Sequence, residues 1–229
     1  MSRSDASSRP QGRAEAARTP PPAGWTWPPS PLVIASHNAG KVREMYALLA
    51  PLGVPLHDAA SLGVPAPDEP GDSFEENAAI KARAVAAASG WFALADDSGV
   101  VVPALGGAPG VHTARWAERA DGRRDFALAI ERLHRAFERL GPGADPRCAY
   151  VCALSLAAPD GRVLTARGEV AGRLVWPPRG HLGSGLEPIF EPAGGDKTYA
   201  ELDPGAKARD NPRARAYAAL TQTLPPRSP

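Results

Sequence analysis

The sequence predicts an α/β fold with a mixed sheet, and three observations carry that prediction. Short apolar runs typical of buried strands alternate with amphipathic helical segments from residue 31 onward. Two long strand patterns are joined by Pro159-Asp160-Gly161, a hairpin signal that adds antiparallel strands to the sheet. With 229 residues, 43% of them hydrophobic, the chain is long enough to bury the core of one domain.

The composition argues against a strong overall attraction to nucleic acid or to an anionic membrane. The net charge is +1 and 22% of the residues are charged, so phosphate affinity must come from local clusters. No apolar run reaches the roughly eighteen residues of a membrane helix, and the first residues lack the pattern of a signal peptide. We therefore expect a cytoplasmic protein with no nucleic acid and no membrane as partner.

Local composition indicates how the chain is divided. Residues 1–30 are rich in Pro, Ser and Arg and predict a disordered extension. Residues 31–222 predict an ordered domain, and residues 223–229 a proline-rich tail.

The two cysteines are not expected to form a disulfide. Cys148 and Cys152 lie four residues apart in a predicted strand, on one face but too far apart for such a bond. We expect both to be small core residues.

The first element is a strand at residues 32–35, and the loop Ser36-His37-Asn38-Ala39-Gly40-Lys41 leads from it into a helix over residues 41–50. Free N–H groups at the start of a helix bind phosphate, and Lys41 adds a full charge there. Asn38 and Ser36 either donate to a ligand or cap the helix. A Walker loop is excluded, because its glycine spacing and its Ser/Thr after the lysine are missing.

A proline-rich connection over residues 53–70 includes a short strand at residues 54–57 and ends with Asp68 and Glu69. Ser73 and Glu76 have the spacing of a capping box, and the alanine-rich run over residues 74–89 predicts a helix. Lys81 lies inside this helix. It is either a second cation for phosphate or a solvated surface lysine.

Residues 92–102 hold two apolar runs around Asp96-Asp97-Ser98-Gly99. This pattern predicts a tight turn that places two carboxylates and a hydroxyl at the ends of strands. Adjacent carboxylates need a cation, and magnesium takes such oxygens together with substrate phosphates. The alternative is a hairpin turn built from an Asx-turn and a glycine.

The rest of the chain predicts a β-hairpin and two more helices. We expect a turn at residues 106–110, a return toward the site at 111–116, an amphipathic helix at 126–140 and strands at 147–157 and 163–170. The loop at residues 176–185 has the composition of a segment that borders a binding site. A short extended piece at 187–190 and a helix at 213–220 complete the fold.

Four of these motifs, in this order, resemble the inosine triphosphatase family. They are the loop at residues 36–41, the helix start Ser73-Phe74-Glu75-Glu76-Asn77, the run Ala95-Asp96-Asp97-Ser98-Gly99, and Gly106-Gly107-Ala108-Pro109-Gly110 with Ala114-Arg115. The resemblance covers residues 32–220. It implies two lobes around a central nucleotide cleft, a homodimer, and magnesium-dependent hydrolysis of non-canonical purine nucleoside triphosphates to monophosphate and pyrophosphate.

The resemblance also implies roles for individual residues. Ser36, His37, Asn38, Ala39, Gly40 and Lys41 would hold the triphosphate, and Lys81 would add positive charge. Asp97, next to Asp96 in the catalytic pair, would act as general base and metal ligand, and Glu69 or Asp68 would complete the magnesium site. Ser98 would touch the substrate.

The C-terminal third departs from the family where the base is read. The family pattern Phe-Gly-Tyr-Asp-Pro appears here as Ser184-Gly185-Leu186-Glu187-Pro188, without either aromatic ring. Lys207 matches the family lysine, but Ser-His-Arg appears as Asn211-Pro212-Arg213. Proline cannot replace the hydrogen bonds of histidine. We therefore expect an altered base pocket; the alternatives are a non-catalytic nucleotide-binding protein and a pyrophosphatase for another nucleotide.

Overall fold

The computed structural model of this protein describes residues 22–226 and contains the mixed sheet that the sequence predicts. Its six strands run in the order β2-β1-β3-β4-β5-β6; β2, β1 and β3 are parallel neighbours, and the pairs from β3 to β6 are antiparallel. The strands are β1 (Leu32–Ile34), β2 (Leu56–Asp58), β3 (Phe92–Val101), β4 (Arg147–Ala157), β5 (Val163–Leu174) and β6 (Phe190–Pro192).

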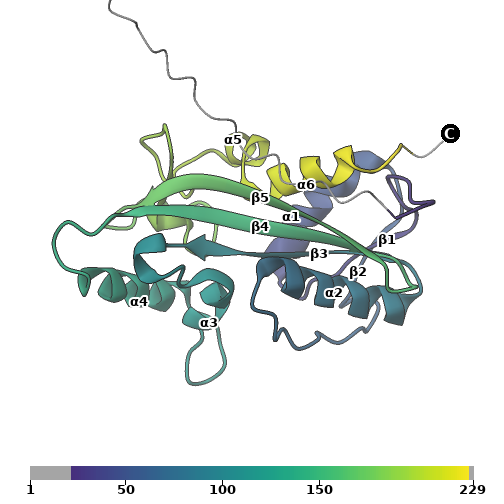
Figure 1. The fold of residues 1–229 in the computed structure, drawn as a ribbon, viewed down its shortest axis with the longest axis horizontal. Coiled ribbons are helices and arrows are strands. Elements are labelled where there is room, and N and C mark those ends of the chain that lie inside the picture. The colour runs from purple at the N-terminus through teal and green to yellow at the C-terminus, as the bar shows by residue number, and fades with distance from the viewer. Residues whose placement is uncertain (1–21, 227–229) are drawn as a thin grey trace, which may run out of the picture.

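Helices cover both faces of this sheet. α1 (Ala39–Leu49) and α6 (Pro212–Gln222) lie on one face, and α2 (Phe74–Ser89) lies on the other (Figure 1). α4 (Phe126–Glu138) packs in the cluster that contains Val100, and α3 (Thr113–Trp116) contacts α4. The short helix α5 (Pro204–Arg209), which the sequence did not predict, precedes α6. The predicted helix over residues 74–89 and the hairpin between residues 147 and 174 are confirmed.

β3 is one continuous strand, so the expected turn at Asp96-Asp97-Ser98-Gly99 is wrong. β4 pairs with β3 throughout, with Asp96 opposite Leu154 and Asp97 opposite Ala153. On its other side β3 pairs with β1 only from Phe92 to Leu94. The polar residues therefore lie in mid-strand, where one edge of β3 is no longer covered by a strand.

Successive residues of this strand point to opposite faces of the sheet. Leu94 packs in the core cluster that includes Met45 of α1 and Leu220 of α6, whereas Ala93 and Ala95 pack in the cluster that includes Val85 of α2. By the same alternation, Asp96 points toward α1 and α6, and Asp97 points toward α2.

The ordered chain begins before Pro31, where we had expected it to start. Trp25 and Trp27 are buried, and the Trp27 backbone N–H donates to the carbonyl of Pro225 at 2.8 Å. Trp25 contacts Phe92 edge-on with ring centroids 5.0 Å apart. This part of the expected extension therefore belongs to the core, while residues 1–21 and 227–229 lie outside the described residues.

Other expectations are confirmed or corrected locally. Cys148 and Cys152 are free and buried, as expected of core residues. The segment at residues 187–190 is a 3₁₀ turn, Glu187–Ile189, followed by β6, rather than wholly extended.

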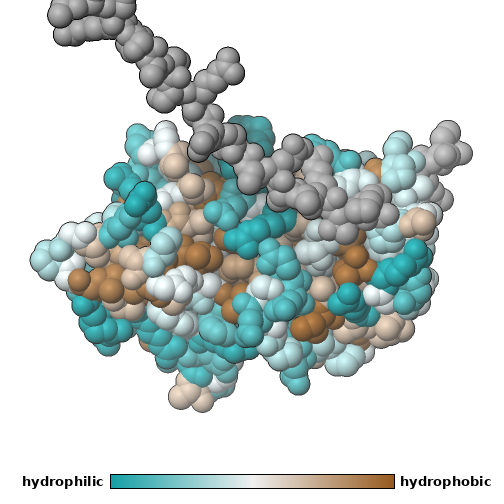
Figure 2. Space-filling view, viewed as in Figure 1, coloured by the Kyte–Doolittle hydropathy of each residue, from teal (hydrophilic) through white to brown (hydrophobic). Residues whose placement is uncertain are grey.

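Polar side chains predominate on the face shown in Figure 2, with smaller apolar patches between them. The large apolar residues exposed within residues 22–226 are Trp91, Leu140 and Leu182. Across the same range, no helix has the length and apolar character needed to span a membrane.

Candidate active site

A cavity of about 610 Å³ lies beside the uncovered edge of β3. The loop after β1, the middle of β3 and the inner side of α2 form one part of its wall. Segments from the C-terminal third, including Ser184, Gly185 and Arg213, form the other part. Nearly all of the site residues that the sequence predicts are thus brought together, although they come from distant parts of the chain.

The loop from Ser36 to Lys41 is held by its own side chains. The Asn38 side-chain oxygen accepts from the backbone N–H groups of Gly40 at 2.9 Å and Lys41 at 3.2 Å, so its capping role is confirmed. The His37 ring lies 2.8 Å from the carbonyl oxygen of Val64. Because these contacts fix the loop, the Lys41 side chain is directed to the cavity from a rigid helix start.

Asp96 forms its ion pairs through one oxygen, while its Oδ1 is buried with no hydrogen-bond partner within residues 22–226. Its Oδ2 lies 3.2 Å from Lys41 Nζ and accepts from Arg213 Nη2 at 2.9 Å, which ties α1 and α6 to β3. Burial alone would raise the pKa of Asp96, but Lys41, Arg213 and Lys81 outweigh burial and hold it far below its usual range. Asp96 is therefore a permanently ionised anchor for two cations.

Asp97 has a different environment on the other face of the strand. Lys81 Nζ donates to Asp97 Oδ1 at 3.0 Å and to Glu69 Oε2 at 2.7 Å. Asp97 Oδ2 is buried and has no hydrogen-bond partner within residues 22–226. Burial raises the pKa of Asp97 despite Lys81 and Lys41, so this carboxylate is a stronger base than an ordinary aspartate.

Lys81 is a buried cation, and the solvated alternative is wrong. Burial lowers the pKa of Lys81, but Asp97, Asp96 and Glu69 together raise it above its ordinary value. The loop that carries Glu69 is itself fixed, because the buried Asn77 side chain accepts from Gly71 N at 2.8 Å and donates to Gly71 O at 3.2 Å. The Arg115 guanidinium also donates to the Glu69 carbonyl at 3.0 Å.

The predicted metal ligands are only partly brought together. Asp97 and Glu69 line the cavity, but Asp68 is exposed and is not part of its wall. No group of three His, Cys, Asp or Glu side chains in the described chain is placed to hold a metal ion by itself. The carboxylates of Asp97 and Glu69, which Lys81 draws together, fit a hard divalent cation that takes its remaining oxygens from substrate or water.

At the other end of the cavity Glu187 and Lys207 form a close ion pair. Lys207 Nζ donates to both Glu187 oxygens, at 2.9 and 3.0 Å, and Ser184 N donates to Glu187 Oε2 at 2.8 Å. Gly183 has a φ of +91°, and a Cβ there would collide with Glu187 Oε2. Residue 183 must therefore be glycine so that the Glu187 carboxylate can contact the loop that precedes it.

Two predicted base-reading residues behave differently. Leu186 is 1% exposed and packs in the core with Ile189 and Phe190, so it is not part of the cavity wall. Pro212 does border the cavity, at the first position of α6, behind Asn211, whose side chain caps the helix. Pro212, at the position of the family histidine, therefore gives the cavity wall an apolar surface. Leu186, at the position of the family tyrosine, packs in the core instead of the wall.

Sequence reasoning missed several wall residues, namely Glu44, Arg124, Phe126, Tyr150, Cys152 and Tyr199. Strand alternation could have found two of them: Tyr150 and Cys152 lie opposite Val100 and Ser98 in the β3–β4 register. In all, six Lys or Arg and five Asp or Glu line the cavity. This near balance means that a bound triphosphate needs further positive charge.

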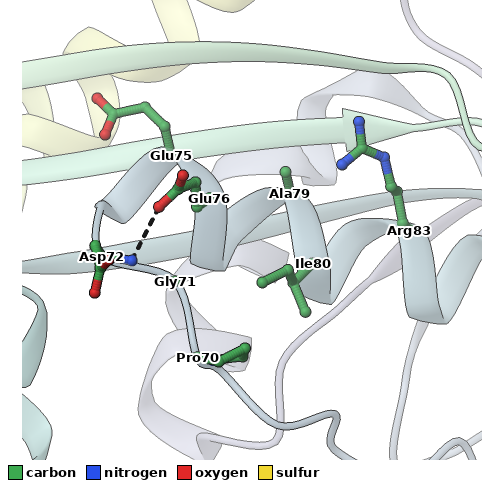
Figure 3. A pocket seen from close by; sticks show the side chains of 8 residues that line it. All are labelled: Pro70, Gly71, Asp72, Glu75, Glu76, Ala79, Ile80 and Arg83. Carbon is green, nitrogen blue, oxygen red and sulfur yellow. Dashed lines mark hydrogen bonds between the residues drawn. The ribbon is translucent and has the colours of Figure 1, made fainter.

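A second hollow, of about 480 Å³, lies on the outer side of α2 and offers no comparable chemistry (Figure 3). Glu76 accepts there from the backbone N–H groups of Asp72 and Ser73, at 2.9 and 3.1 Å, which confirms the predicted capping box. Arg83, the one basic residue among the eight that line this hollow, donates to the carbonyl of Gly161.

The chain resembles one family of proteins over most of its length. The model of that family, described as the Ham1 family, matches residues 32–223. The chain is 50% identical over 202 residues to a protein named dITP/XTP pyrophosphatase from Rhizobium meliloti, with 84% of this chain and 94% of that relative covered. It is 48% identical over 201 residues to a dITP/XTP pyrophosphatase of Mesorhizobium japonicum, covering 83% and 91%.

Solved structures give the same result. A HAM1 protein from Coxiella burnetii has a TM-score of 0.76 and 35% identity, with 83% of this chain and 96% of that chain covered. The Ham1 protein of Staphylococcus aureus has a TM-score of 0.72 and 32% identity, with the same coverage.

Proposed function

Because this chain belongs to the Ham1 family, we propose that it hydrolyses non-canonical purine nucleoside triphosphates, such as dITP, ITP and XTP, to the monophosphate and pyrophosphate. The names of the relatives support this substrate class. The observation that carries the proposal is Lys81, held between Glu69 and Asp97 in the cavity while Asp97 Oδ2 is left free. A buried carboxylate with one anchored and one free oxygen is suited to take a proton from water.

The cations of the cavity hold the triphosphate. Lys41 reaches it from the start of α1, where the positive end of the helix dipole adds to its charge. Lys81 and Arg115 approach from the opposite wall, on the α2 side of the sheet. Because Asp96 fixes Lys41 and Arg213 in advance, little side-chain entropy is lost when the substrate binds.

Hydrolysis takes place at the α-phosphorus. Asp97 Oδ2 accepts a proton from water as the water oxygen bonds to the α-phosphorus, and the bond from that phosphorus to the bridging oxygen breaks. Pyrophosphate leaves with the electron pair of the broken bond. Lys81 keeps Asp97 oriented through Oδ1, so the free Oδ2 remains directed at the cavity.

Asp97 and Glu69 are the residues that would hold magnesium. Bound there, the ion would supply Lewis-acid chemistry and neutralise phosphate oxygens. The near balance of charge along the wall supports this need for an added cation.

The base end of the cavity is altered relative to the family pattern. Lys207 remains, but its ammonium is paired with both oxygens of Glu187, and Pro212 offers no hydrogen bond. Substrate preference at this end therefore depends on wall residues other than the family tyrosine and histidine. The family resemblance also supports a cytoplasmic location and a homodimer. Light scattering on the purified protein would test whether it is a dimer.

The test is a panel of ITP, dITP, XTP, ATP and GTP, assayed for pyrophosphate with magnesium and with a chelator. We expect equal amounts of monophosphate and pyrophosphate, release that depends on the metal, and a preference for the non-canonical bases. Triphosphate binding without any product would instead identify a nucleotide-binding protein that lacks turnover. Preference for a canonical triphosphate would contradict the proposed substrate class.

A further inference from the structure

Two tyrosines border the end of the cavity that holds Glu187 and Lys207. Tyr150 comes from β4, and Tyr199 comes from the segment after β6. Their ring centroids are 6.0 Å apart, and Phe190 packs against both, at 5.3 Å from Tyr150 and 4.9 Å from Tyr199. Because the three rings support one another, the two tyrosines form a rigid part of the wall.

The Tyr199 hydroxyl is buried but makes no hydrogen bond with any described residue. The whole side chain is 2% exposed, and yet the residue lies in the cavity wall. A buried hydroxyl without a partner is costly and rare in folded proteins. Tyr46 shows the ordinary situation, since its hydroxyl donates to Asp58 Oδ2 at 3.2 Å. The missing partner of Tyr199 is therefore expected to come from a ligand.

Tyr150 lies against the loop that carries Gly185, at the edge of the cavity. A Cβ on Gly185 would lie 3.4 Å from the Tyr150 hydroxyl and 3.8 Å from a ring carbon of Phe126. Aromatic rings thus line this part of the cavity wall, although Ser184 and Leu186 supply none. Flat rings provide a stacking surface for a purine.

We propose that Tyr150 and Tyr199 recognise the purine base, Tyr150 as an aromatic wall and Tyr199 through a hydrogen bond from its hydroxyl. This inference rests on the proposed function and names the residues that take over from the family aromatic and histidine positions. The Tyr199 hydroxyl donates in the proposed hydrogen bond, and the Lys207 ammonium, although paired with Glu187, has donors only, so the edge that meets these groups should carry an acceptor. An oxygen at the purine C6 position satisfies this requirement, and the amino group of adenine does not.

Tyr199→Phe tests the hydrogen bond because it removes only the hydroxyl. We expect KM for ITP to rise about three- to tenfold, the size of one neutral hydrogen bond, while kcat changes less than twofold. Competitive inhibition by inorganic tripolyphosphate, which has no base, should stay unchanged. The melting temperature should not fall, because no intramolecular hydrogen bond is lost. A purely structural role for the hydroxyl would instead lower the melting temperature and leave KM alone.

Tyr46→Phe is the matched control, since it also removes one hydroxyl but lies away from the cavity. It should lower the melting temperature and leave KM for ITP unchanged. Tyr150→Leu, which removes the ring, should raise KM for ITP and again spare tripolyphosphate inhibition. If wild type hydrolyses ITP but Tyr199→Phe has an unchanged KM, the inference is wrong and the proposed function stands. Absence of turnover in wild type would instead remove the proposed function.

Discussion

Asp96 and Asp97 have opposite environments because neighbouring strand residues face opposite sides of a sheet. Asp96 meets Lys41 and Arg213 on one side, and Asp97 meets Lys81 on the other. The pKa of Asp96 is lowered and that of Asp97 is raised. Asp96 is therefore an anchor that stabilises the fold, and Asp97 is the residue that we propose as the general base.

Asp96→Asn should lower the free energy of unfolding by about 3 kcal/mol or more, since it leaves buried Arg213 with only the exposed Glu44 carboxylate as a charge partner. The stabilisation by Asp96 is present above its unfolded pKa, near 3.8, and is lost as the pH falls through its lower folded pKa. Urea unfolding at neutral pH measures the change. Asp97→Asn, which removes a poorly solvated carboxylate, is the matched control and should cost clearly less; equal losses would contradict the distinction.

The pH dependence of turnover should reflect Asp97. The base must be ionised, so kcat/KM should fall in acid as Asp97 takes up a proton. Burial raises the pKa of the metal-free Asp97 carboxyl, and a magnesium ion bound there would lower it. The buried Asp97 carboxylate destabilises the fold when it is ionised, above its raised folded pKa. This destabilisation is relieved as the pH falls below that pKa. A pH profile of pyrophosphate release tests this. A kcat/KM that stays constant with pH throughout the acid range in which the protein is folded would contradict Asp97 as the base.

The position of α6 depends on a glycine in β5. Gly168 faces the start of α6 so closely that a Cβ would collide with the carbonyl oxygen of Pro212 and the backbone nitrogen of Ala216. This close approach brings Arg213 over the sheet to Asp96. Packing of α6 on β5 therefore positions a residue of the cavity wall.

Gly168→Ala should push α6 away from β5 and lower the melting temperature by several degrees, because the colliding atoms are backbone. KM for ITP should rise as well, since Arg213 moves with the helix. Thermal unfolding and steady-state kinetics measure both effects. Gly195→Ala is the control, as its Cβ would meet the carbonyl oxygen of Pro192 at 3.4 Å, an ordinary contact. A stable Gly168→Ala protein with normal KM would refute this account.

Local patterns predicted most elements but not how the ends of β3 are paired. The caps at Asn38 and Ser73, the alanine-rich helix and the Pro159-Asp160-Gly161 hairpin were read correctly because neighbouring residues determine them. The run from Asp96 to Gly99 was misread as a turn, because its polarity reflects a cavity and not a chain reversal. The polar run stays extended because it pairs with β4, which is distant in the sequence. It borders a cavity because β1 is short and pairs only with Phe92 to Leu94.

The same limit applies to the candidate site. Motifs identified Lys41, Lys81, Asp97 and Glu69, whose side chains converge. They did not reveal Tyr199, which no local pattern links to the nucleotide loop, and Tyr150 could be found only through the register of β4 with β3. Leu186 was misplaced for a related reason, since whether a loop residue faces the cavity or the core depends on packing by Ile189 and Phe190.

At the scale of the whole molecule, the N-terminal segment closes the core against the C-terminus. Trp27 pairs with the chain near Pro226, and Trp25 packs on Phe92 under the guanidinium of Arg162, 5.7 Å from the ring centroid. Both tryptophans precede the part of the chain that matches the family, residues 32–223. The segment therefore adds apolar burial to a domain whose active site lies elsewhere.

Trp25→Ala should lower the free energy of unfolding by about 3–5 kcal/mol, the usual cost of removing a buried aromatic ring. Because Trp25 is not in the cavity wall, the kcat of the remaining folded protein should be normal. Chemical unfolding and active-site titration measure these quantities. Trp91→Ala, at an exposed tryptophan, should cost far less, and equal losses at the two sites would contradict a structural role for the segment.

Pyrophosphate release by Asp97→Asn, compared with wild type at saturating ITP and magnesium, tests the central claim most directly. We expect kcat to fall by at least about a hundredfold, the size of a general-base contribution, while ITP still binds and the protein stays folded. Turnover within a fewfold of wild type would contradict Asp97 as the base and, with it, this account of the site.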